Sequence, residues 1–176
     1  MKPLIGTDLK RFLRDYRRKH RPARRIAALL QSVEYPVNVG SIFRMADAAG
    51  MAELVLAGIT PTPPHPTIDK VGRHKSSNLP WRYEEDAVVA AQQLKAAGYR
   101  LVAVELTRQS VPYHLYDYPE RTCLVVGHED HGVTRATLAA CDAAVFIPMY
   151  GKGRSMNVHV ALSVVVFHAL HCGVAN

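Results

Sequence analysis

From residue 26 onward, short apolar runs alternate with longer stretches that suit helices. Apolar runs of four to eight residues are typical of buried strands. The expected strands are residues 26–33, 53–58, 100–106, 122–127 and 143–148, and the expected helices are residues 38–50, 86–97, 134–140 and 155–170. Strands that alternate with helices predict an α/β fold, in which a parallel sheet carries helices on both faces.

One segment, residues 59–81, does not fit this alternation. It contains five prolines and is expected to be a loop. Loops of this length are uncommon in compact domains unless they serve a function. Its second half, "GRHKSSN" at residues 72–78, is basic and carries Arg73 and Lys75.

Residues 1–25 form a region with a pattern of its own. Leu9, Phe12, Leu13 and Tyr16 follow the i, i+3, i+4, i+7 spacing of one helical face, with cations around it. We therefore expect a basic N-terminal helix, ended by a later proline, whose apolar face packs on the body of the protein.

The charge of the chain is concentrated in this arm. Residues 1–25 hold ten Lys and Arg against two Asp, a net charge of +8, whereas residues 26–176 have a net charge of −1. Such asymmetry indicates a polyanionic partner, either nucleic acid or an anionic membrane surface. We expect RNA, and the alternative is a surface helix whose charges are merely solvated.

Composition narrows the setting in which the protein works. No apolar run reaches the roughly 18 residues of a membrane span, and no apolar stretch near the N-terminus suits a signal peptide. Three scattered cysteines, an odd number, suit reduced thiols. A cytoplasmic protein without membrane association is expected, and its nine histidines show no spacing typical of metal ligands.

Polar residues gather where three of the predicted strands end. The first set is Asn38-Val39-Gly40 followed by Arg44, the second spans residues 127–132, and the third opens the segment 147–170. Ligands of open α/β sheets bind beyond the carboxyl ends of the strands, so these sets predict one shared site.

Several known motifs fail on spacing. "HEDH" lacks the i, i+4 histidines of zinc proteases, and "GKGRS" lacks the upstream glycine of a P-loop. A Gly-x-Gly-x-x-Gly dinucleotide fingerprint does not follow the first strand. No metal is expected.

Taken together, the three sets resemble the ordered motifs of the SpoU/TrmH family, within the SPOUT superfamily of RNA methyltransferases. The stretches that carry the resemblance are "NVGSIFRMADAAG", "LVVGHEDHGVT" and "IPMYGKGRSMNVHVALSVVVFHAL". The resemblance covers residues 26–171 and implies a SPOUT methyltransferase domain over residues 26–176. It also implies a deep trefoil knot in the C-terminal third, which composition alone does not indicate.

The same resemblance implies a binding site for S-adenosylmethionine (AdoMet). Ile147 and Met156 would sandwich the adenine, and backbone groups near Gly127 would hold the ribose and methionine parts. Glu105 and Ser155 match further cofactor positions. Ser155 would also face the reaction site with Asn157, and both residues suit the start of the last helix.

Methyl transfer from AdoMet to a ribose 2′-hydroxyl of RNA is the implied reaction. Arg44 matches the family's essential arginine; because arginine hardly deprotonates, we expect it to stabilise the developing alkoxide and grip a phosphate. Asn38 would hold Arg44 or the ribose. Glu129 would order the loop of the second motif, with a cation as its candidate partner.

The expected RNA contacts combine the arm with the body. They are Arg11, Arg14, Arg17, Arg18, Arg44, Arg73, Lys75 and Arg154. The compact chain favours tRNA over rRNA as the substrate. Two alternatives stay open: a non-catalytic RNA-binding protein on the same scaffold, and an enzyme that acts on a small molecule.

A homodimer is expected from the resemblance, because family members pair through the knot. The last helix supports this expectation with a sequence of few polar positions. The residues taken for a half-exposed apolar face are Val158, Leu162, Val165, Val166 and Ala169.

Overall fold

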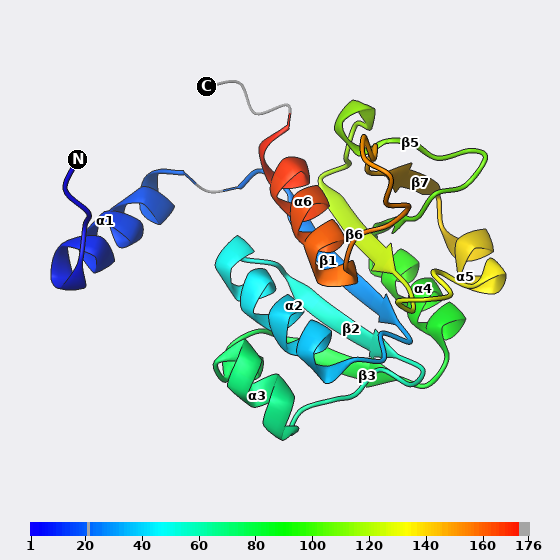
Figure 1. The fold of residues 1–176 in the computed structure, drawn as a ribbon, viewed down its shortest axis with the longest axis horizontal. Helices are drawn as coiled ribbons and strands as arrows, with labels where there is room; N and C mark the ends of the chain where they lie inside the picture. The colour runs from blue at the N-terminus through cyan, green and yellow to red at the C-terminus, as the bar shows by residue number, and fades with distance from the viewer. Residues whose placement is uncertain (21, 173–176) are drawn as a thin grey trace.

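The fold is a seven-stranded sheet with helices on both faces, as the computed structural model shows (Figure 1). The structure describes residues 1–20 and 22–172. Every strand pairing is parallel, and the strand order is β3-β2-β1-β6-β4-β7-β5. The predicted α/β class is therefore confirmed.

The bounds of the elements lie close to the expected ones where the sequence pattern was strong. The strands are β1 (Arg25–Gln31), β2 (Glu53–Ala57), β3 (Trp81–Glu84), β4 (Arg100–Val104), β5 (Val111–Pro112), β6 (Arg121–Val126) and β7 (Ala143–Phe146). The helices are α1 (Gly6–Lys19), α2 (Pro36–Ala49), α3 (Pro66–Gly72), α4 (Ala87–Ala96), α5 (Arg135–Ala140) and α6 (Val158–His171), with short 3-10 turns η1 (Lys75–Ser77) and η2 (Tyr113–Leu115).

Each central strand contributes to two hydrophobic cores, because successive side chains point to opposite faces of a sheet. In β1, Ile26, Ala28 and Leu30 join the core under α2 and α6, whereas Ala27 and Leu29 join the core under α4 and α5. This burial on both faces explains why the strands read as continuous apolar runs rather than as alternating ones.

The helix ends follow ordinary capping chemistry. Asp86 accepts hydrogen bonds from the N–H groups of Val88 and Val89 at the start of α4, and Thr134 caps α5 in the same way. Gly50 ends α2 in the left-handed conformation at φ +65°, which glycine adopts without strain.

The expectation of a loop over residues 59–81 was wrong in part. The segment contains helix α3 and the turn η1, and it leads into strand β3, which extends the sheet beyond β2. Pro66 stands at the first turn of α3, where its missing N–H costs no hydrogen bond. Pro66 therefore suits the start of a helix, and the prolines of this segment do not exclude one.

The last helix begins later and faces inward more than expected. α6 starts at Val158 with Asn157 as its N-cap, so Ser155 lies before the helix and not in it. The apolar positions Leu162, Val165, Val166 and Ala169 are buried in the core of their own chain. They do not form the half-exposed face inferred from the sequence; the exposed apolar residues of α6 are Val160 and Phe167.

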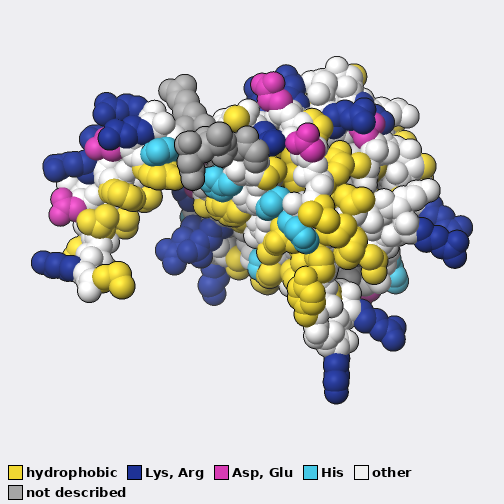
Figure 2. All heavy atoms as spheres, turned by 90° about the horizontal axis from the view of Figure 1, so that it is seen from above, with side chains coloured by type: hydrophobic (Ala, Val, Ile, Leu, Met, Phe, Trp, Pro, Cys, Tyr) yellow, Lys and Arg dark blue, Asp and Glu magenta, His cyan; other side chains and the backbone are white. Residues whose placement is uncertain are grey.

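Helix α1 does not pack on the body, contrary to the expectation. It projects away from the sheet in Figure 1, and it contains no buried residue. Its apolar side chains Leu9, Phe12, Leu13 and Tyr16 are 39 to 53% exposed. Figure 2 shows this band of hydrophobic side chains on the arm next to its cations.

Arg24 fastens the chain between the arm and β1 to the body. Its side chain is largely buried, and its guanidinium donates to the carbonyl oxygens of Tyr118 (2.6 Å), Ala169 (3.3 Å) and Cys172. Arg24 and the neighbouring Arg25, which donates to the Tyr99 hydroxyl at 3.3 Å, are thus structural residues. Not all cations of residues 1–25 are free to meet RNA.

Within the part of the chain that the structure describes, no helix is long and apolar enough to cross a membrane. The same residues contain no group of three side chains placed to hold a metal ion.

Candidate active site

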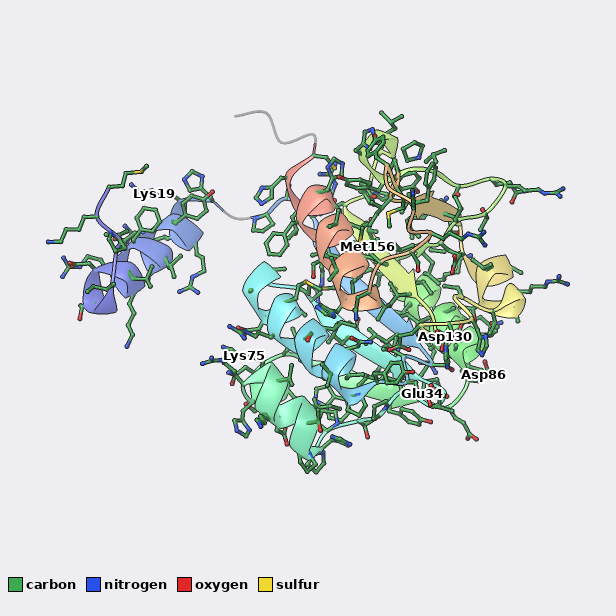
Figure 3. All side chains as sticks on the ribbon, in the orientation of Figure 1. Lys19, Glu34, Lys75, Asp86, Asp130 and Met156 are labelled. Carbon is green, nitrogen blue, oxygen red and sulfur yellow. The ribbon has the colours of Figure 1, made fainter. Side chains whose placement is uncertain are left out.

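A cavity of about 960 Å³ lies where β4, β6 and β7 end, next to the start of α2. It brings together members of all three sets of residues that the sequence singled out, with Asn38 alone from the first set. The predicted site residues that line it are Asn38, Glu105, Gly127, Glu129, Ile147, Arg154, Ser155, Met156 and Asn157. In Figure 3, Glu34 and Asp130 mark the carboxyl edge of the sheet, and Met156 lies on the segment that precedes α6.

A tight hairpin after β6 forms one wall of this cavity. The backbone of His128 and Gly132 exchanges hydrogen bonds of 3.1 and 2.8 Å. A Cβ atom on Gly127 would lie 2.2 Å from the carbonyl carbon of Gly132. The two backbone segments of the hairpin therefore approach too closely for any residue other than glycine at position 127. The glycines of the second motif are therefore required by packing.

Glu105 holds the hairpin from the neighbouring strand. Its Oε2 accepts a hydrogen bond from the Val133 N–H at 3.0 Å, and its Oε1 accepts one from the Leu106 N–H at 3.0 Å. A Cβ on Gly132, which has φ +65°, would lie 2.3 Å from this carboxylate. Glu105 thus lines the cavity, and its carboxylate organises the wall.

Glu129 connects the hairpin to the start of α2. Its carboxylate accepts hydrogen bonds from the N–H groups of Glu34 (3.0 Å) and Tyr35 (3.3 Å) and from Nδ2 of Asn38 (2.6 Å). Among the described residues it forms no ion pair, so the expected cation partner was wrong. Backbone N–H groups at a helix N-terminus take the place of that cation, because they carry partial positive charge.

The pKa of Glu129 reflects these donors. Burial on its own would raise the pKa, but the hydrogen bonds from Asn38, from the Glu34 and Tyr35 N–H groups and from its own backbone outweigh burial. The pKa of Glu129 is therefore lower than usual, and the carboxylate is ionised at neutral pH.

Asn38 joins the first motif to the third. Its side chain is buried, and its Oδ1 accepts a hydrogen bond from Nδ2 of Asn157 at 3.1 Å. Asn157 in turn accepts the His159 N–H at 3.0 Å, as the N-cap of α6. Nδ1 of His159 lies 3.3 Å from the same Oδ1 of Asn38. One network therefore runs from Glu129 through Asn38 to the start of α6.

Arg44 lies outside the large cavity. It lines a second cavity of about 340 Å³, together with Ser41, Met45, Ala48, Val71 and His159. Of the two partners considered for Asn38, Arg44 is not hydrogen-bonded to it in the described part of the chain, and the ribose stays a prediction. His159 connects the two cavities: it contacts Asn38, which lines the large cavity, and it lines the cavity of Arg44 itself.

The predicted RNA contacts of the body are scattered. Lys75 forms a 2.8 Å ion pair with Asp47 at the end of α2, on the side of the body that faces α1 (Figure 3). Arg73 is exposed after α3, and Arg154 lines the large cavity. Arg11, Arg14, Arg17 and Arg18 are exposed on α1.

Two site features were missed by the sequence analysis. His159 was not singled out among the nine histidines, although its position two residues after Asn157 could have placed it in the first turn of the last helix. His128 forms a 3.2 Å pair with Glu34 through Nε2, which depends on strand ends that are distant in sequence.

The lining of the large cavity fits AdoMet. Its volume is in the range of pockets that enclose such ligands. Val104, Phe146 and Ile147 offer apolar surface for an adenine, next to the backbone polar groups of residues 127–132. Carboxylates of Glu105 and Asp130 lie in the lining and suit a ligand with a positive sulfonium and an ammonium group.

The parallel α/β fold, with three ordered motifs around a cofactor-sized cavity at its carboxyl edge, defines the class: an AdoMet-dependent RNA methyltransferase. The family comparison agrees with this class. The chain belongs to the SpoU rRNA methylase family, whose family model matches residues 25–167.

Relatives of this chain act on tRNA and on rRNA. It is 33% identical over 162 residues to a tRNA (guanosine(18)-2′-O)-methyltransferase of Thermus thermophilus, covering 91% of this chain and 80% of that protein. It is 29% identical over 154 residues to the 23S rRNA (guanosine(2553)-2′-O)-methyltransferase RlmP of Bacillus subtilis, covering 85% of this chain and 61% of that protein.

Solved structures share the fold. An AdoMet-bound rRNA methyltransferase of Sinorhizobium meliloti has a TM-score of 0.76 at 28% identity, over 86% of this chain and 58% of that chain. A second structure, described for 2-OH methylation of C/U34 on tRNA, has a TM-score of 0.72 at 26% identity, over 84% of this chain and 95% of that chain.

The hairpin yields a first prediction. Gly132→Ala places a methyl group against the Glu105 carboxylate and requires a left-handed alanine, so AdoMet affinity should fall at least about tenfold, or about 1.4 kcal/mol. Isothermal titration calorimetry measures this affinity. Gly151→Ala is the matched control, because its Cβ would meet no atom within 4 Å. Equal affinities for the two variants would show that the hairpin does not shape the cofactor site.

The low pKa of Glu129 yields a second prediction. Because the folded pKa of Glu129 is depressed, its stabilisation is present in full above the ordinary pKa of 4.5 and is lost as pH falls through the folded value. Glu129→Gln should lower the free energy of unfolding at pH 7 by about 1 to 3 kcal/mol. Urea unfolding between pH 7 and pH 3 should show the two proteins converging in acid. A gap that stays constant across this range would contradict the prediction.

Proposed function

We propose that this protein transfers the methyl group of AdoMet to a ribose 2′-hydroxyl of tRNA. One observation carries the proposal: Asn38 and Asn157 line the cofactor-sized cavity, and His159, whose Nδ1 lies 3.3 Å from Oδ1 of Asn38, lines the cavity of Arg44. A ribose placed where these side chains meet would lie between the methyl donor and a guanidinium.

The residues then divide the work. AdoMet supplies an activated methyl group on a sulfonium. The hairpin wall, Ile147 and Met156 would hold it, with Ser155 facing the acceptor. Arg44 would bind the phosphate beside the ribose and stabilise negative charge on the oxygen, as a guanidinium is suited to do. Asn38 and Glu129 would fix the wall by their hydrogen bonds rather than contact the phosphate.

A tRNA substrate is supported by the relatives that align over most of their own length. The Thermus thermophilus protein, aligned over 80% of its length, and the C/U34 structure, aligned over 95%, are both described for tRNA. The Bacillus subtilis rRNA enzyme aligns over 61% of its length.

We assign residues 1–25 to an RNA-binding arm and residues 26–176 to the methyltransferase domain. Support comes from the exposure of α1 and from its cations, which lie next to an exposed apolar band (Figure 2). A cytoplasmic location stays part of this proposal, since its substrate would be found there.

A homodimer and a trefoil knot complete the proposal. Exposed apolar side chains on α6 and just before it, Val160, Phe167, Met149 and Tyr150, support pairing through this region. The knot is supported by the path of the chain in its last part. Strand β7 lies between β4 and β5 in the sheet, and after β7 the chain continues on the face opposite α5, where α6 contacts α2. Light scattering that gives a mass near 19.5 kDa would argue against the dimer.

A third prediction tests the activity. Purified protein with radiolabelled AdoMet should label tRNA and leave rRNA fragments unlabelled, and nucleoside mass spectrometry should find a 2′-O-methyl product. Arg44→Ala should lower the rate at least about 100-fold, with AdoMet affinity within a few-fold, because Arg44 lies outside the cofactor cavity.

Arg135→Ala on α5, an exposed arginine on the opposite face of the sheet, is the matched control and should keep the wild-type rate. Cofactor binding without methyl transfer to any RNA would favour the alternative of a non-catalytic RNA-binding protein. Methyl transfer to a small molecule alone would favour the alternative of an enzyme that acts on a small molecule.

A fourth prediction tests the arm. Each phosphate contact releases counterions, so RNA affinity should fall steeply with salt. Reversing the charge of Arg11, Arg14, Arg17 and Arg18 together should weaken binding and flatten the plot of log affinity against log salt. AdoMet affinity should stay unchanged. An unchanged salt slope would identify α1 as a helix whose charges are only solvated, and would move the RNA surface to Arg73 and Arg154.

A further inference from the structure

His159 occupies a position that the family motifs do not assign. It is the second residue of α6, and it is half-buried. Nδ1 is 3.3 Å from Oδ1 of Asn38, and the side chain lines the cavity that contains Arg44. A histidine at this junction can exchange a proton with a group bound there.

The hydrogen-bond network determines which nitrogen of His159 carries a proton. The Glu129 carboxylate is ionised and can only accept hydrogen bonds. The Asn38 atom 2.6 Å from it must therefore be the amide nitrogen, which points Oδ1 toward α6. The negative charge of Glu129 therefore determines which end of the Asn38 amide is the nitrogen and which is the oxygen.

Asn157 confirms the direction of the network. Its Oδ1 accepts the His159 backbone N–H, so its Nδ2 is the atom that donates to Oδ1 of Asn38. Oδ1 of Asn38 is an acceptor only, and the His159 nitrogen next to it must donate. Neutral His159 therefore carries its proton on Nδ1.

Its other nitrogen, Nε2, then holds a lone pair. Across residues 1–20 and 22–172, no protein group forms a hydrogen bond to this atom, and it is not among the buried atoms that lack a partner. The charged group that shares its cavity is Arg44, and Glu129 stands one hydrogen bond behind Asn38. Nε2 is thus a base on a side chain that lines the same cavity as Arg44, a cation that can bind an RNA phosphate.

We propose that His159 is the proton acceptor for the ribose 2′-hydroxyl. This inference rests on the proposed methyl transfer to RNA. Arg44 is poorly suited to the task, because a guanidinium stays protonated at physiological pH. The two residues divide the roles: Arg44 holds the negative charge and His159 takes the proton.

The proton and the electrons balance in one displacement. The bond from the ribose oxygen to the methyl carbon forms as the bond from that carbon to sulfur breaks, and the sulfonium becomes a neutral thioether. The hydroxyl proton moves to Nε2 of His159, which becomes an imidazolium. Solvent then takes that proton at the mouth of the Arg44 cavity, and the imidazole returns to its Nδ1–H form.

His159→Asn is the decisive variant. The Asn amide can still donate to Oδ1 of Asn38 from near the place of Nδ1, but it offers no base. The single-turnover rate should fall about 100- to 10,000-fold, with AdoMet and RNA affinities within a few-fold. His171→Asn, an exposed histidine in the last turn of the same helix, should keep the wild-type rate. A His159→Asn rate within twofold of wild type would overturn the role.

Two further measurements separate a proton acceptor from a structural residue. Added imidazole should restore part of the rate of His159→Ala, and the decline in wild-type rate at acid pH should disappear in His159→Asn. Failure of imidazole to raise the His159→Ala rate, or an acid decline that persists in His159→Asn, would count against the role.

NMR of the histidine-labelled protein without RNA tests the geometry independently of activity. The ¹⁵N shifts of His159, assigned by comparison with His159→Asn, should report a neutral ring protonated on Nδ1. Protonation on Nε2 would refute the inference. An inactive wild-type protein with the Nδ1–H tautomer would instead refute the proposed function, and the proton-transfer role with it.

Discussion

The site depends on the carboxylate of Glu129. It accepts hydrogen bonds from two N–H groups before α2 and from the Asn38 amide, and so joins the hairpin after β6 to the helix that follows β1. Because these donors come from a segment about 90 residues away in sequence, the carboxylate aligns motifs that local structure could not align. The orientation of Asn38, and with it the tautomer inferred for His159, follows from this one negative charge, and the N-cap hydrogen bond of Asn157 agrees with that orientation.

Glycine has a different part in the same wall. The hairpin closes because Gly127 and Gly132 allow two backbone segments to approach more closely than a Cβ permits. Glu105 then fills the space beneath the turn with a carboxylate that two N–H groups satisfy. In the second motif, the glycines are therefore required by close packing of the backbone, and Glu129 is required for its negative charge.

The sequence predicted the parts of the fold that local chemistry determines. Buried strands such as β1 and β6 and the extent of helices such as α4 were recognisable, because apolar runs and helix-ending residues act over a few positions. Strand β3 and the two-residue strand β5 were missed, since each is defined by pairing with a distant strand. The inward face of α6 was missed because an all-apolar helix does not indicate which side meets its own core.

The link between the arm and the body has a mechanical consequence. Arg24 binds the carbonyl of Ala169 near the end of α6, whereas Asn157 and His159 stand at the start of that helix. A helix of 14 residues is a stiff rod about 21 Å long. Tension on the arm from a bound polyanion would thus be carried along the axis of α6, from its anchor at Arg24 to the residues that divide the two cavities.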